Sequence, residues 1–134
     1  MFRIATRRDS PAIKALLANQ SVQVDGLDWD NVTPFWVVYD KQGETVACAQ
    51  LLMARPMGQI NHLCVKEDMN GSSRARVVNR ISDEATKLFQ KAGLHHIGWF
   101  VSHNNRAVKK AVKRRGASAF TSGSIYVSKI NAIT

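Results

Sequence analysis

The chain has 134 residues, 45% of them hydrophobic and 22% charged, which fits a single domain over residues 1–134 that buries its own core. No apolar run approaches the roughly 18–20 residues of a membrane-spanning helix, and the first residues lack the apolar segment of a signal peptide. These features argue against a membrane protein and predict a cytoplasmic one.

Positive charge is concentrated in the second half of the chain. The net charge is +9, and every charged side chain after Glu84 is a lysine or an arginine. Such a half favours an anionic partner, either nucleic acid or a phosphate-bearing cofactor. The basic segment 106–116 contains no recognised nucleic-acid motif and no stacking aromatic residue, so specific nucleic-acid binding is not expected.

The first half of the chain predicts a strand, a helix and a three-stranded meander. Residues 2–6 alternate as a short strand, and Asp9-Ser10-Pro11 supplies a helix start with proline at the first helical position. Residues 20–34 predict a loop or a short irregular helix. Strands are expected at 35–39, 45–54 and 59–65, separated by turns at 40–43 and 55–58.

The second half predicts two more helices and a final hairpin. A long helix follows residue 70, because apolar residues recur at spacings of three and four until Gly93 ends it. A strand at 94–101 precedes a helix that Asn104 or Asn105 caps and Gly116 closes. With a hairpin over 117–130, the order β-α-β-β-β-α-β-α-β-β fits one α+β domain with a mixed central sheet flanked by helices.

The stretch VKEDMNGSSRARVV, residues 65–78, joins a strand to the long helix through small and basic residues. Unpaired N–H groups and the helix dipole make such a helix start a ready anion site. Gly71 there tolerates a positive φ and a closely approaching phosphate. The segment has neither a Walker sequence nor a dinucleotide fingerprint. A capped helix start without a ligand is the alternative interpretation.

Four stretches, in this order along nearly the whole chain, resemble the GNAT family of acetyl-CoA-dependent N-acetyltransferases. FRIATRRDSPAIKALL resembles its first strand and helix, and FWVVYDKQGETVACAQLL its central hairpin. INHLCVKEDMNGSSRARVV lies at the cofactor loop, where the family's Gln/Arg-x-x-Gly-x-Gly/Ala falls on Asn70, Ser73 and Ala75. SHNNRAVKKAVKRRGA resembles the late helix, with Asn105 and Gly116 retained.

The resemblance implies transfer of an acetyl group from acetyl-CoA to an amine by direct attack on the thioester. The acceptor would be a small-molecule amine, or a protein N-terminus or lysine, and the assembly is left open, a homodimer included. Pyrophosphate would be held across Gly71, Ser72, Ser73, Arg74, Ala75 and Arg76. The pantetheine arm would pair with Leu63, Cys64 and Val65, and Asn105 would reach the same arm.

His62, beside the cofactor loop, is the predicted general base, because the ordinary pKa of histidine lies near neutrality. An ordinary hydrogen-bonded histidine is the alternative, and the carboxylates of Glu67 and Asp68 are further candidates. No His or Cys spacing predicts a metal site, and Cys48 and Cys64 are expected to be reduced thiols.

Asp28, Trp29 and Asp30 are the predicted acceptor-binding residues. Carboxylates beside an indole suit a cationic amine through charge and cation–π attraction. They fall where the family's first two helices border the acceptor. A solvated acidic loop remains the competing interpretation.

The chain departs from the family at the tyrosine that protonates the leaving thiolate. That position falls on Val112 or Ala111, neither of which donates a proton. Two hypotheses follow: a slow N-acetyltransferase, or a catalytically silent GNAT-shaped binding or structural protein of the kind some tailed phages encode. A basic nucleic-acid-associated protein is a third.

Overall fold

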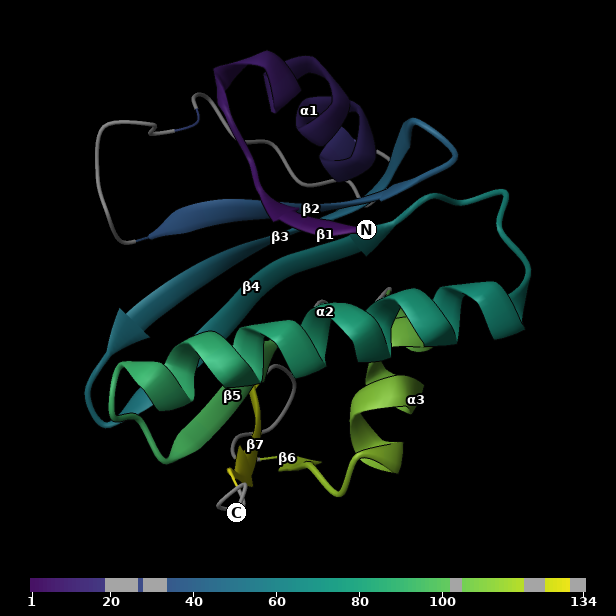
Figure 1. The fold of residues 1–134 in the computed structure, drawn as a ribbon. Helices are drawn as coiled ribbons and strands as arrows, with labels where there is room; N and C mark the ends of the chain where they lie inside the picture. Colours follow the sequence, from purple (N-terminus) through teal and green to yellow (C-terminus); the bar gives the residue numbers. More distant parts are fainter. Residues whose placement is uncertain (19–26, 28–33, 102–104, 120–124, 131–134) are drawn as a thin grey trace.

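A seven-stranded sheet with helices on both faces forms the protein (Figure 1). The computed structural model describes residues 1–18, 27, 34–101, 105–119 and 125–130. The helices are α1 (Ser10–Ala18), α2 (Gly71–Lys91) and α3 (Arg106–Arg114), with a 3-10 turn at Arg7–Asp9. The strands are β1 (Phe2–Ile4), β2 (Phe35–Lys41), β3 (Glu44–Ala54), β4 (Met57–Val65), β5 (His96–Phe100), β6 (Ser118–Ala119) and β7 (Ile125–Lys129).

The sheet is mixed, as the sequence predicts. Its spatial order is β1-β2-β3-β4-β5-β7-β6, and only the pair β4–β5 is parallel. The predicted order of helices and strands is confirmed. Most of the loop expected at 20–34, together with Ser122 and Gly123 of the last turn, lies outside the described residues.

The first helix starts slightly earlier than the sequence predicts, because α1 begins at Ser10 after a 3-10 turn at Arg7–Asp9, and Pro11 is its second residue. In the 3-10 turn, the Asp9 carboxylate accepts the backbone N–H of Thr6 at 2.8 Å and two bonds from the Arg3 guanidinium at 2.8 and 2.9 Å. The hydrogen bonds from Arg3 lower the pKa of Asp9. Arg3 also donates to Asp40 at 2.7 Å, so one guanidinium joins β1, the 3-10 turn and the β2–β3 hairpin.

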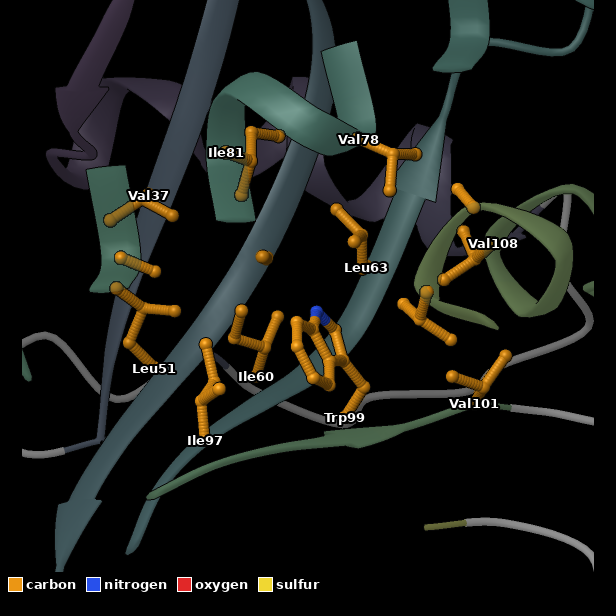
Figure 2. Packing of buried hydrophobic residues seen from close by; sticks show 14 of the residues in the cluster. Val37, Leu51, Ile60, Leu63, Val78, Ile81, Ile97, Trp99, Val101 and Val108 are labelled. Carbon is orange, nitrogen blue, oxygen red and sulfur yellow. The ribbon is translucent and has the colours of Figure 1, made fainter. Parts of the chain in front are cut away.

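Two apolar clusters lie on opposite faces of the sheet. The larger one joins the strands to α2 and α3, and Figure 2 shows Leu63 and Val108 pointing into it from β4 and α3. The smaller one packs α1 against β2, β3 and β4. Val77, Val78, Ile81, Ala85 and Phe89 of the predicted stripe on α2 are buried. The periodicity therefore identified the core-facing side of the longest helix.

Gly58 sets how closely α2 approaches β4. A Cβ atom built on Gly58 would lie 2.3 Å from the ring of Phe89, which is fully buried. No real side chain tolerates such a distance, and the ring has little freedom because it is enclosed by the core. A Cβ atom on Gly71, at the opposite end of α2, meets nothing within 4 Å.

These two glycines give a matched test of the packing. Gly58→Ala should lower the free energy of unfolding by about 1–3 kcal/mol, because overpacking displaces the Phe89 ring. Gly71→Ala should leave stability unchanged or raise it by up to roughly 1 kcal/mol, because alanine favours helix. Urea unfolding followed by circular dichroism measures both, and equal stabilities for the two variants would contradict the packing described.

Candidate functional site

A fork between β4 and β5 is the main irregularity of the sheet. The two strands pair from Gly58 opposite Ile97 to Asn61 opposite Phe100, where β5 ends. Strand β4 continues to Val65, toward the start of α2, and among the described strands β3 alone pairs with it there (Figure 1). One edge of β4 is therefore open over its last residues.

A β-bulge at His62 lies at the start of the fork. Gln50 of β3 pairs with Asn61, but Cys48 pairs with Cys64, so β4 has one residue more than β3 across this interval. His62 takes the extra position with a left-handed φ of +53°. Bulges bend a strand and increase its twist, which directs β4 away from β5.

The backbone of β4 inside the fork alternates in direction. The N–H of Lys66 donates to the carbonyl of Val46 on β3 at 2.7 Å, so the backbone of Lys66 faces β3. Strand alternation turns Val65 and Leu63 the other way, into the fork, and Cys64 toward β3. The carbonyl of Leu63 accepts a hydrogen bond from the side chain of Asn105 at 3.0 Å, which agrees with this assignment.

Asn105 uses both ends of its amide. Its Nδ2 donates to Leu63 across the fork, and its Oδ1 accepts the N–H of Val108 at 3.3 Å, capping α3. Of the two predicted caps, Asn105 is therefore the observed one, and Asn104 lies outside the described residues. The start of α3 is thereby positioned over the open edge of β4, where the resemblance to the GNAT family implies that Asn105 meets a pantetheine arm.

The start of α2 is capped by Asn70, whose Oδ1 accepts the N–H of Ser73 at 2.9 Å. This bond takes one donor of the predicted pyrophosphate loop and leaves the N–H groups of Gly71 and Ser72 directed beyond the helix end. Gly71 does not use the positive φ that glycine would tolerate there, because Asn70 supplies the extended residue and Gly71 already has helical geometry. The open space at Gly71 is the feature that remains relevant to a ligand.

Arg74 folds back over the loop between β4 and α2. Its guanidinium donates to the backbone carbonyl of Glu67, and its Nε atom is buried without a hydrogen-bond partner. A buried donor of this kind is expensive unless some group accepts from it. Ala75 is half-buried, and Arg76 is exposed on the same first turns of the helix.

No protein-family model and no curated protein sequence matches this chain. Solved structures do. Ard1 from Thermoplasma volcanium superposes with a TM-score of 0.74 at 15% identity, covering 98% of each chain. The chain has the GNAT acetyltransferase fold.

Two further structures share the GNAT fold. The ribosomal-protein-S18-alanine N-acetyltransferase from Escherichia coli gives a TM-score of 0.70 at 15% identity, over 100% of this chain and 96% of that one. N-acetylglutamate synthase from Neisseria gonorrhoeae, complexed with coenzyme A and N-acetyl-glutamate, gives 0.64 at 17% identity over 98% of this chain. This chain spans only 35% of that larger protein.

His62 projects from the α1 face of the GNAT fold. Its ring stacks on Trp36, with centroids 6.1 Å apart and planes inclined by 20°, and Trp36 belongs to the cluster beneath α1. The side chain is exposed, but the packed surroundings remove part of its water and lower the pKa of His62 from its ordinary value near 6.5. The imidazole is therefore neutral at physiological pH.

The remaining predicted site residues lie away from His62 or outside the described residues. The thiol of Cys64 is buried against that of Cys48 beneath α1, and hydrogen bonding to Cys64 together with burial raises the pKa of Cys48. Glu67 is exposed, and Asp68 lies 3.6 Å from Lys66. Asp28, Trp29 and Asp30 lie outside the described residues.

Asn61 and Phe100 border the fork, and sequence reasoning missed both. Phe100 keeps 38% of its surface exposed, and the Oδ1 atom of Asn61 is buried without a partner. Nothing in the local sequence marks them, because their importance comes from the end of the β4–β5 pairing. Across the described ranges, no helix is long and apolar enough to cross a membrane, and no cluster of His, Cys, Asp or Glu could hold a metal ion.

The position of the family's tyrosine is filled by core methyl groups. Val112 is completely buried and Ala111 keeps only 4% exposure, both in the cluster between α3 and the sheet. A tyrosine at Val112 would have to displace this packing before its hydroxyl reached the fork.

Val112→Tyr should therefore destabilise the domain by about 1–3 kcal/mol through overpacking, without creating a functional proton donor. Lys110→Tyr, on the exposed side of α3, is the matched control and should stay within about 0.5 kcal/mol of the parent. Urea unfolding measures both changes. A fully stable Val112→Tyr variant would contradict the enclosed environment of this side chain.

Proposed function

We propose that this protein is an N-acetyltransferase that binds acetyl-CoA at the β4–β5 fork and transfers acetyl to a primary amine. The observation that carries the proposal is the conjunction of an open β4 edge, a capped helix N-terminus and a histidine at one bulge. The shared fold of the ribosomal-protein-S18-alanine N-acetyltransferase, and of the N-acetylglutamate synthase complexed with coenzyme A, supports it.

The residues present fit a coenzyme A thioester. The N–H groups of Gly71 and Ser72 would receive pyrophosphate oxygens, with the helix dipole favouring their charge. The buried Nε atom of Arg74 lacks an acceptor, and a phosphate oxygen is a chemically suitable one. The remaining loop positions, Ser73, Ala75 and Arg76, would surround the same group.

The pantetheine arm would follow the open edge of β4. Leu63 and Val65 turn their backbone groups into the fork, and an extended amide chain pairs with such groups as a strand would. Asn105 already bonds the carbonyl of Leu63, so its amide would bridge the arm and the strand. Cys64 would contribute only as the intervening residue of β4.

His62 would act as the general base. It is neutral at physiological pH, exposed, and held by its stack on Trp36. A neutral imidazole at the fork can take the proton that the amine loses as the new C–N bond forms. Acetyl-CoA supplies the activated acyl group, and water would return a proton to the departing thiolate, because neither Val112 nor Ala111 has one to give.

A coenzyme A-binding protein without catalysis is the second candidate. The buried methyl groups at Val112 and Ala111 favour it, because general-acid assistance is typically worth about 10²–10⁴-fold in rate. A thiolate is a competent leaving group without that help, so slow transfer remains the better-supported function. Localisation in the cytoplasm, where acetyl-CoA is available, belongs to the same proposal.

The cofactor site predicts a specific binding defect. Gly71→Val should weaken coenzyme A binding at least tenfold, about 1.4 kcal/mol, because its methyl groups would occupy the open space above the helix start. Isothermal titration calorimetry with coenzyme A measures this effect. Arg80→Val, exposed further along α2, is the control and should bind normally. Equal affinities for parent and Gly71→Val would remove the pyrophosphate loop from the site.

The proposed role of His62 as general base predicts how the rate of acetyl transfer depends on pH. With an acceptor amine that is uncharged over this range, the rate should rise with pH as His62 loses its proton, with an inflection below pH 6.5, because the pKa of His62 is lowered. His62→Gln should lower the rate by about 10²–10⁴-fold and abolish this inflection. A thiol-release assay records both.

His96→Gln, on an exposed residue at the start of β5, controls for removal of a histidine and should keep the parent profile. A His62→Gln enzyme with parental rate and inflection would assign the base to another group.

A further inference from the structure

One row of side chains crosses four strands and ends at the fork. Trp36 pairs with Gln50, Gln50 pairs with Asn61, and Asn61 pairs with Phe100. Residues paired in this way project to the same face of a sheet. The row therefore runs from beneath α1 to the point where β5 ends.

This row lies on the α1 face, opposite α2 and α3. Leu51, Ile60 and Trp99, each adjacent in sequence to a member of the row, are buried in the cluster beneath α2. Strand alternation then places Gln50, Asn61 and Phe100 on the other side. His62 shares that side because its ring stacks on Trp36.

Asn61 has an unsatisfied hydrogen-bond acceptor. Its Oδ1 atom is buried and has no partner, at the last paired residue before the fork. Buried polar atoms of native proteins are almost always hydrogen-bonded, so each exception calls for a partner. The carbonyl oxygen of an amide accepts hydrogen bonds and cannot donate them, so that partner is an N–H or O–H group.

Phe100, opposite Asn61, is one of the few large hydrophobic side chains that the described part of the chain leaves exposed. The exposed ring of Phe100 thus lies beside the unsatisfied oxygen of Asn61. A ligand held there would meet an apolar ring on one side and a hydrogen-bond acceptor on the other. Such a surface suits an N–H group attached to an apolar or flat body.

We infer that Asn61 and Phe100 form the acceptor floor, and that Oδ1 of Asn61 accepts one N–H of the attacking amine and so selects primary amines. This inference rests on the proposed acetyltransferase function, whose acceptor is a primary amine, and adds the two residues that would hold this amine and enforce the choice. Asn61 would contact the substrate directly, beside the base His62.

The selection follows from the valences of nitrogen. An uncharged primary amine has one lone pair and two N–H bonds. The lone pair forms the C–N bond to the acyl carbon while the C–S bond breaks with its electron pair remaining on sulfur. One N–H gives its proton to His62, and the other is held by Asn61. A secondary amine has a single N–H and leaves one of the two acceptors without a partner.

Nuclear magnetic resonance titrations with aniline and N-methylaniline test the inference. Both probes are uncharged at neutral pH and differ by one methyl group, and coenzyme A is kept at saturation to complete the fork without chemistry. The parent protein should bind aniline about tenfold more tightly than N-methylaniline, with chemical shift changes at Asn61 and Phe100.

Two substitutions separate hydrogen bonding from shape. Asn61→Leu removes the acceptor and should reduce the aniline preference to nearly onefold, while Asn61→Asp retains oxygen acceptors and should keep the preference. Gln59→Leu, on β4 and the same face but outside the fork, is the control and should behave as the parent.

A parent protein without preference for aniline, or an Asn61→Leu variant that keeps the preference, overturns the inference. So does an Asn61→Asp variant that behaves like Asn61→Leu. If coenzyme A binds and any of these results appears, the inference fails and the proposed function stands. If coenzyme A itself does not bind, both the proposed function and the inference about the acceptor floor fail.

Discussion

The hydrogen-bonding requirement of β4 beyond Asn61 is the constraint on which the rest of the site depends. A strand that loses its neighbour leaves N–H and C=O groups that need partners. Asn105 supplies one of them through its bond to the carbonyl of Leu63, and in doing so it fixes where α3 begins. The unpaired edge of β4 therefore both opens the sheet at the fork and fixes the start of α3.

The fork also connects the two faces of the sheet. The start of α2, with Arg74, belongs to the face that carries the larger core. His62 and the row ending at Phe100 belong to the face beneath α1. Under the proposed function, a ligand that entered between β4 and β5 would reach both faces, so the charged and the reactive parts of a bound thioester would lie in different surroundings.

The fold followed from the sequence wherever a local rule decided the outcome. Periodicity located α2 and its buried stripe, Gly93 and Gly116 adopt the positive φ expected after a helix, and Asn105 caps α3. The start of the first helix was located less well. Pro11 was expected at the first helical position, but a 3-10 turn precedes α1 at Arg7–Asp9, where the Asp9 carboxylate accepts the Thr6 N–H and the Arg3 guanidinium.

The candidate site could be predicted from the sequence only in part. The strand-loop-helix segment and Asn105 could be identified because their residue types match a recognisable spacing. The bulge could not, since it is a mismatch of register between two strands and His62 is not a glycine that would suggest a left-handed φ. Asn61 and Phe100 depend on that mismatch, and so does the face on which His62 lies. The enclosure of Val112 required knowledge of the packed core.

The single extra residue in the bulge of β4 has an evolutionary consequence. Before it, Gln50 pairs with Asn61, and after it Cys48 pairs with Cys64, so omitting His62 alone would make the two segments continuous in one register. The buried residues on either side would keep their faces. A single codon thus separates the bulged β4 from a strand that pairs with β3 without interruption.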